Sequence, residues 1–365
     1  MKQSTSAPRL CPAGRARALV LLATLALQTG VAAMEPLAAA HYEFGRGLEL
    51  PALHLDLRGY TTVRAQDLEG EAAQIQWHDF SLFAIWTPAP TWQLFTEIEG
   101  ESLLVGDQRG VNSGDAEVQV ERLYLDHSVS RYASVRAGRF LTPFGRWNQI
   151  HADPLVWTVT RPLVTVIAIP DHLSGVMVYG TVPLARNSIE YSAYVDASDE
   201  MDPHQGHASF EDYHLPGVSN VMEHAAGGQL RYHFLDERAQ IGLSYASFAV
   251  ERGRGYHHAL GLDGLFTWRR FEWSSEVVYR ANLDQSARDD WGGFMQLVAP
   301  LFGQFYGVGR LEYYSRGVLS QDARRGTVGL AWRPQPALSF KFEYHDGSDR
   351  GLLPDGFELS CGLLF

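Results

Sequence analysis

The sequence has no long hydrophobic run beyond its N-terminus. There, no stretch of this 365-residue chain approaches the roughly 18 consecutive apolar residues that a transmembrane helix needs. Hydrophobic residues nevertheless make up 45% of the chain, and the mean hydropathy is −0.16. The mature chain is therefore either soluble or crosses a membrane as β-strands.

Lysine and cysteine are also scarce. The only lysines are Lys2 and Lys341, and the only cysteines are Cys11 and Cys361. Cys11 precedes the apolar N-terminal segment, so a processed chain keeps one cysteine and has neither an intramolecular disulfide nor a Cys-ligated metal site. The net charge is −12, which makes nucleic acid a poor partner.

The N-terminus has the pattern of a secretory signal peptide. A short apolar run, 18–27, follows four basic residues, Lys2, Arg9, Arg15 and Arg17. We expect cleavage after Ala33 or Ala40; the alternative, an uncleaved membrane anchor, requires a longer run. The signal peptide thus occupies 1–40, and 41–52 form an N-terminal periplasmic segment.

From residue 53 onward, apolar and polar residues alternate with a period of two. In 53–64, for example, Leu55 and Leu57 share one face and Asp56 and Arg58 share the other. Many of the segments have the 9–12 residues that a tilted strand needs to cross a hydrocarbon core. The predicted strands are 53–66, 73–87, 92–101, 117–127, 133–140, 174–183, 187–198, 228–235, 240–251, 257–268, 271–280, 291–299, 304–315, 324–333, 337–345 and 356–365.

Two of these strands, 73–87 and 117–127, change the phase of their alternation midway. A β-bulge or a misplaced boundary explains such a change.

The connections alternate between short and long. Short turns are predicted at 88–91, 128–132, 184–186, 236–239, 269–270, 300–303 and 334–336. Longer connections are predicted at 100–116, 141–173, 198–227, 281–290 and 346–355. Strands span lipid only when they close edge to edge. We therefore predict an all-β, transmembrane antiparallel β-barrel of about 16 strands over 53–365, with short periplasmic turns and long extracellular loops.

Aromatic residues mark the ends of this barrel. The pairs Trp86 and Trp92, Trp268 and Phe271, and Trp332 and Phe340 flank short turns, where an interfacial girdle belongs; ordinary packing at strand ends is the alternative. The last strand places Phe357, Leu359, Cys361, Leu363 and Phe365 on one face. This pattern resembles the C-terminal assembly signal of bacterial outer-membrane proteins, so we expect the barrel-assembly machinery as a partner.

The segments Val118–Asp126 and Arg136–Gly145 (RAGRFLTPFG) resemble a hairpin and following loop of Gram-negative porin-like proteins, broadly the phosphate-selective porin group. The specific match covers about 30 residues. The resemblance implies an outer-membrane barrel, commonly of 16 strands and often trimeric, whose third extracellular loop folds into the lumen. The near absence of lysine departs from the phosphate-selective pattern, so that specificity is not carried over.

By strand count, 141–173 is this third loop, and it contains the candidate pore constriction: Arg139, Arg146, Asp153, Arg161 and Asp171. Trp147, His151, Trp157 and His172 lie nearby in sequence. Arginines facing carboxylates across a pore would orient and filter solutes. The same residues could instead pin the loop to the barrel wall through ion pairs.

Charged residues on the polar strand faces are candidates for the lumen wall: Asp56, Arg58, Arg64, Glu97, Glu99, Arg310 and Glu312. A second segment, 199–224, contains His204, His207 and His214 among carboxylates. Imidazole and carboxylate suit divalent metals, but the spacing matches no metal signature, and a solvated loop is the favoured interpretation. We expect no cofactor.

These observations favour a passive channel for small hydrophilic solutes in the bacterial outer membrane, in contact with lipid and lipopolysaccharide. A homotrimer is one expectation from the resemblance. We expect no enzymatic activity, because the sequence lacks recognisable catalytic motifs. The alternatives are a plugged structural or receptor barrel, an outer-membrane hydrolase and a soluble secreted β-sandwich.

Overall fold

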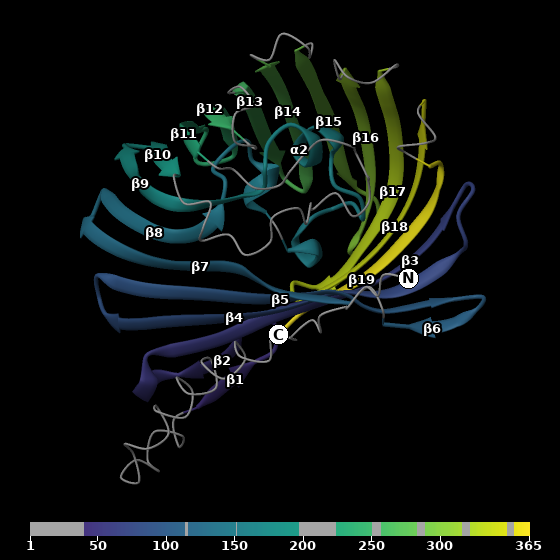
Figure 1. Cartoon of the computed structure of the whole chain (residues 1–365), viewed down its shortest axis with the longest axis horizontal. Coiled ribbons are helices and arrows are strands. Elements are labelled where there is room, and N and C mark those ends of the chain that lie inside the picture. The colour runs from purple at the N-terminus through teal and green to yellow at the C-terminus, as the bar shows by residue number, and fades with distance from the viewer. Residues whose placement is uncertain are drawn as a thin grey trace, which may run out of the picture.

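The strands form one sheet that curves into a closed ring (Figure 1). The computed structural model describes residues 40–113, 116–150, 152–196, 224–249, 257–282, 289–315, 322–348 and 354–365. Setting aside the three short strands β1, β2 and β6 from this 19-stranded sheet leaves 16 long antiparallel strands. Pairing of β19 with β3 closes the ring. The predicted barrel is confirmed.

The first half of the barrel contains β3 (Leu55–Leu68), β4 (Gln74–Ala89), β5 (Trp92–Asp107), β7 (Glu117–Ser130), β8 (Ala133–Leu141), β9 (His172–Leu184), β10 (Asn187–Asp196) and β11 (His224–Phe234). The second half contains β12 (Ala239–Ala249), β13 (His257–Trp268), β14 (Phe271–Asn282), β15 (Asp290–Pro300), β16 (Phe305–Ser315), β17 (Ala323–Gln335), β18 (Leu338–Gly347) and β19 (Gly356–Leu364). In the described part of the chain, no helix is both long and apolar enough to span a membrane.

The two faces of the ring differ in polarity. On β16, Arg310 is 1% exposed while the next residue, Leu311, is 65% exposed. On β17, Thr327 is 2% exposed and Val328 is 62% exposed. Polar side chains therefore point inward and apolar side chains form an outer band, which is the arrangement that lipid requires.

The predicted aromatic pairs lie beside short turns. Trp268 and Phe271 stack with their ring centroids 5.9 Å apart, and Trp332 and Phe340 stack at 5.0 Å. Trp86 and Trp92, on either side of the turn between β4 and β5, are exposed. These exposed rings at the short-turn end fit an interfacial girdle.

The two changes of alternation phase correspond to β-bulges. The pairing of β4 shifts between Trp77 and Asp79. The pairing of β5 with β7 shifts between Glu97 and Ile98, so that Glu121 is the extra residue on β7. Both phase changes are therefore bulges rather than misplaced boundaries.

The connection expected at 100–116 is largely sheet. Strand β5 continues to Asp107, and β6 (Gly110–Asn112) folds back against it. Ser102 has a φ of 47°, and the register against β4 shifts between Glu101 and Leu104. This bulge interrupts the alternation, so the sequence pattern ends the strand too early.

Short connections join the strand pairs where they were expected, including the two-residue links 185–186 and 269–270. The segment 41–52 contributes β1 (His41–Glu43) and β2 (Gly47–Leu50), of which β2 pairs with β3. A 3₁₀ turn, η2 (Pro51–Leu53), leads into β3. The proposed signal peptide lies outside the described residues, apart from Ala40.

Candidate functional site

The segment 142–171, which connects β8 to β9, lies inside the ring (Figure 1); we call it the strap. Its described residues, 142–150 and 152–171, include two 3₁₀ turns and one short helix. These are η3 (Trp147–Gln149), η4 (Asp153–Leu155) and α2 (Leu163–Ile167). Most strap residues are buried, because they pack against the inward faces of the strands.

An apolar cluster fixes one side of the strap. All five residues of α2 are buried. Its four apolar residues share a buried cluster with Phe144 and Trp147 of the strap and with Phe294 and Tyr314 of the wall. Trp147 meets Phe294 edge to face, with ring centroids 6.5 Å apart. Removing these side chains from water favours the seated strap.

Three wall carboxylates accept hydrogen bonds from the strap backbone. Glu276 Oε1 accepts from the N–H groups of Arg146 at 2.7 Å and Trp147 at 2.6 Å. Glu343 accepts from Val159 N at 2.7 Å and Thr160 N at 2.9 Å. Glu312 Oε2 accepts from Leu163 N at 2.6 Å. Each such bond contributes about 0.5–3 kcal/mol, with the larger values for an ionised carboxylate.

Wall cations bind the strap's carbonyl and hydroxyl oxygens. Lys341 Nζ donates to Asp153 O at 3.0 Å, Asp153 Oδ1 at 2.9 Å and Thr158 O at 2.9 Å. Arg310 donates to Thr158 Oγ1 at 2.7 Å and to Thr160 O at 2.9 Å. Charged side chains of both signs on β14–β18 therefore bind backbone groups of the strap that would otherwise be buried without hydrogen-bond partners.

Further arginines extend this anchoring. Arg325 donates to Arg161 O at 2.7 Å and to Glu312 Oε1 at 2.8 Å. Arg333 donates to Val156 O at 2.7 Å, and its guanidinium lies 3.9 Å from the ring centroid of Trp157. Neither Arg325 nor Arg333 was among the residues predicted from the sequence. The alternation of polar and apolar residues along β17 could have identified Arg325, because it lies on the same face of the strand as Thr327.

Four of the five proposed constriction residues lie on the strap. Asp153 pairs with Lys341 at 2.9 Å, and Arg161 pairs with Asp171 at 3.2 Å. Burial raises the pKa of Asp153, but Lys341 and Arg64 lower it more strongly, so the pKa is below its usual 3.8. The Asp153–Lys341 pair joins the strap to β18, whereas Arg161 and Asp171 both belong to the strap and pair within it.

The two remaining arginines differ in position. Arg146 is half-buried on the strap, and its side chain forms no hydrogen bond or ion pair with other described residues. Arg139 is on β8 opposite Leu123, an exposed residue of the outer face. Alternation therefore directs Arg139 away from the lumen, and its Nε donates to Glu121 O at 3.2 Å.

Of the proposed wall residues, Arg64, Glu97, Glu99, Arg310 and Glu312 are buried on inward faces. Glu99 accepts a hydrogen bond from Tyr60 Oη at 2.6 Å, and Glu97 accepts one from Ser81 Oγ at 2.5 Å. Asp56 and Arg58 pair with each other at 3.1 Å near the short-turn end. The weak metal candidates His204, His207 and His214 lie outside the described residues, as does His151.

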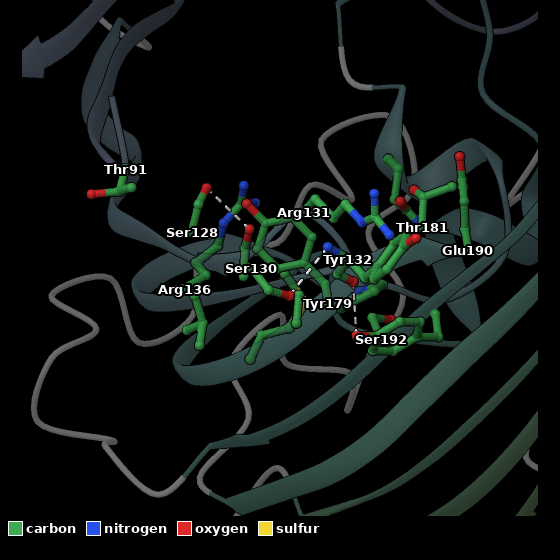
Figure 2. A pocket seen from close by; sticks show the side chains of 18 residues that line it. Thr91, Ser128, Ser130, Arg131, Tyr132, Arg136, Tyr179, Thr181, Glu190 and Ser192 are labelled. Atoms are coloured by element: carbon green, nitrogen blue, oxygen red, sulfur yellow. Dashed lines mark hydrogen bonds between the residues drawn. The ribbon is translucent and has the colours of Figure 1, made fainter. Parts of the chain in front are cut away.

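A cavity of about 820 Å³ lies at the short-turn end beside β8–β10. Pro143 and Gln149 of the strap line it together with inward-facing residues such as Ser134, Arg136 and Tyr179. In the view of Figure 2, Arg136 and Glu190 lie toward opposite sides, with Tyr132 and Tyr179 between them. The strap therefore leaves space against this part of the wall.

Two charged groups of this cavity, Arg136 and Glu190, already have partners, while Arg131 lies over the ring of Tyr132. Arg136 forms two hydrogen bonds to Asp126, both 2.8 Å long, and lies 3.6 Å from the Tyr124 ring centroid. Glu190 lies 3.3 Å from His233 Nε2. The cavity thus carries a held cation on one side and a carboxylate on the other.

Comparison with known proteins finds no matching family model. An uncharacterized protein of Aquifex aeolicus (strain VF5) is 37% identical over 102 residues. This match covers 27% of the chain but only 22% of the length of that protein.

Solved structures match over most of the chain. OmpT, an outer membrane protein of Vibrio cholerae, in its trimer form, has a TM-score of 0.56 at 9% identity, covering 85% of this chain and 99% of its own. OmpF of Salmonella typhi has a TM-score of 0.56 at 8% identity, covering 85% and 97%. An anion-selective porin from Comamonas acidovorans has a TM-score of 0.52 at 12% identity, covering 85% and 99%.

At these identities the likeness is one of fold. The closed ring and its apolar outer band agree with that fold. The chain therefore has the β-barrel fold of these outer-membrane porins.

Proposed function

We propose that the chain is a channel for passive diffusion of small hydrophilic solutes, narrowed by the strap. The observation that carries this proposal is the cavity of about 820 Å³ between the strap and the inward faces of β8–β10. Solutes would pass along this wall, because the strap's hydrogen bonds to the wall are made with β11, β12 and the strands from β14 to β18.

Charge selection in this channel would come from Arg146. The other strap charges of the proposed constriction are neutralised within ion pairs, whereas the side chain of Arg146 has no such partner among the described residues. A cationic side chain on the strap that forms no ion pair would act on ions that pass the narrowing. Asp153, Arg161 and Asp171 would fix the strap's position and contribute little net charge.

Phosphate selectivity does not belong to this proposal. Lys341 is the only lysine in the barrel, and its ammonium group already makes three hydrogen bonds to the strap. The hydroxyl groups of Ser134, Tyr132 and Tyr179 line the cavity, which suits polar solutes with little charge.

Sidedness and assembly complete the proposal. The short turns would face the periplasm and the long connections the exterior. The trimer form of a similar barrel supports a homotrimer, assembled by the barrel-assembly machinery among lipid and lipopolysaccharide. The absence of enzymatic activity stays a prediction.

A second candidate function is a plugged structural or receptor barrel. The observation that favours it is the number of anchors on the strap, which bonds to Glu276, Glu312 and Glu343 on three different strands. A strap held this firmly could close the lumen instead of narrowing it.

Solute efflux from proteoliposomes separates the two candidates. Vesicles containing purified full-length protein would be loaded with radiolabelled glucose and with labelled dextran of a few kilodaltons. A channel releases glucose and retains dextran. Folded protein that releases neither solute supports the plugged barrel and contradicts the channel.

A further inference from the structure

Three potential metal ligands meet at the junction of β18 and β19. Glu343, His345 and Glu358 offer ligand atoms that all lie within 4.8 Å of one another. All three residues are buried on the inward face. Glu343 and Glu358 are direct cross-strand partners, an arrangement that is unfavourable for two like charges. A cation between them would relieve the repulsion.

The hydrogen bonding of His345 fixes which ring nitrogen can bind a cation. Its Nε2 lies 2.9 Å from Pro354 O, and a carbonyl only accepts, so Nε2 carries the proton. In a neutral ring, Nδ1 then carries the lone pair. Nδ1 lies 3.8 Å from Glu358 Oε1 and has no hydrogen-bond partner. A ring whose far nitrogen donates to a backbone carbonyl is the usual form of a metal-bound histidine.

The wall cations Lys341, Arg310 and Arg325 lie near the site and are engaged with the strap, Arg325 through Arg161 O at 2.7 Å; Arg64 is a further cation close by. The three donors of Lys341 bind Asp153 and Thr158, and Arg310 binds Glu312, Thr158 and Thr160. The carboxylate of Glu343 accepts two N–H groups of the strap, and its oxygens retain further lone pairs. One of these remains for a metal ion.

We propose that Glu343, His345 and Glu358 form a divalent-cation site, with Zn²⁺ as the best-fitting ion of the first transition series. One imidazole nitrogen and carboxylate oxygens are ligands that Zn²⁺ accepts. The ion connects β18, β19 and, through Glu343, the strap backbone. This site does not depend on whether the barrel conducts.

Zinc binding by the full-length protein in detergent tests the proposal. The chain should retain one Zn²⁺ after dialysis, measured by elemental analysis, and chelation should lower its thermal unfolding midpoint. His345→Gln and Glu358→Gln should each weaken binding by at least tenfold. Heat-modifiable gel migration shows whether each variant is folded.

Two controls address the other histidines. His233→Gln is the matched variant, since His233 lies 3.3 Å from Glu190 and 3.4 Å from Glu237 on another part of the wall. A triple His204→Ala, His207→Ala, His214→Ala variant removes the weak sequence candidates. Both should keep the zinc. Loss of all zinc in either control overturns the proposal.

X-ray absorption at the zinc edge keeps the test independent of mutant folding. On the unaltered protein it should show one imidazole nitrogen in a shell otherwise made of oxygen. A shell with two or more imidazoles, or protein that retains no zinc, contradicts the site.

Discussion

Gly59 on β3 and Phe365, the last residue, exchange two backbone hydrogen bonds where the barrel closes. Gly59 N donates to Phe365 O at 2.8 Å, and Phe365 N donates to Gly59 O at 2.9 Å. A Cβ at position 59 would lie 2.6 Å from Phe365 Cζ and 2.4 Å from Ser81 O. Glycine therefore provides the space that the terminal ring occupies, and that ring stacks on Phe80 at 5.8 Å.

Gly59→Val should accordingly reduce closure of the barrel. The added side chain must displace either the terminal ring or the β4 backbone, so we expect a much smaller heat-modifiable fraction after refolding in detergent. Gly309→Ala is the matched control, because a Cβ there meets no atom within 4 Å. Equal folding of the two variants would show that the contact between Gly59 and Phe365 does not limit closure.

Releasing one anchor of the strap should widen the lumen. Glu276→Ala removes the acceptor of two strap N–H groups, each bond contributing about 0.5–3 kcal/mol. We expect a lower thermal unfolding midpoint together with a larger single-channel conductance. Glu237→Ala, at an exposed turn position, should change neither quantity. A destabilised barrel with unaltered conductance would mean that the strap does not border the passage.

The two arginines at the base of the strap provide a paired test of selectivity. Arg146→Gln removes a strap charge that has no ion-pair partner among the described residues, so the reversal potential in a salt gradient should shift toward cation preference. Arg139→Gln should leave it unchanged, because Arg139 shares the outer face with Leu123. The opposite ranking of the two variants would refute the assignment of Arg146.

Asp153 should make strap anchoring sensitive to acid. Its pKa in the folded chain is below the usual 3.8 because Lys341 and Arg64 outweigh the effect of burial. A depressed carboxylate pKa stabilises the fold above the unfolded value, and this stability is lost as the pH falls through the folded pKa.

The unfolding midpoint should therefore fall more steeply below pH 3.8 in the unaltered protein than in Asp153→Asn. Asp67→Asn, at an exposed position, is the control and should follow the unaltered protein. Identical acid profiles for all three proteins would show that ionisation of Asp153 does not make strap anchoring sensitive to acid.

The strand pattern could be predicted because each strand has one face in lipid and one face inside the ring. Alternation such as Arg310 next to Leu311 marks both the strand and the direction of each side chain. The bulges at Trp77–Asp79 and near Glu121 were visible as phase changes for the same reason. The extension of β5 was missed, since a bulge at Ser102 interrupts the pattern.

The strap could be predicted as a loop but not in its contacts. Which wall it meets depends on backbone N–H groups, such as those of Val159 and Thr160, that every sequence carries. The facing of Arg139 could not be predicted, because polar residues at 136 and 139 leave the orientation of β8 ambiguous. Only the pairing with Leu123 resolves it.

Thiol accessibility of the cavity during single-channel recording tests the central claim most directly. In a Cys361→Ser background, Ser134→Cys places a thiol on the inward face opposite Tyr179, within the cavity. A charged methanethiosulfonate reagent should then reduce the stepwise conductance, while Leu297→Cys on the outer face should be insensitive. Folded barrels that show no conductance steps, or steps that modification at position 134 leaves unchanged, would contradict a passage between the strap and this wall.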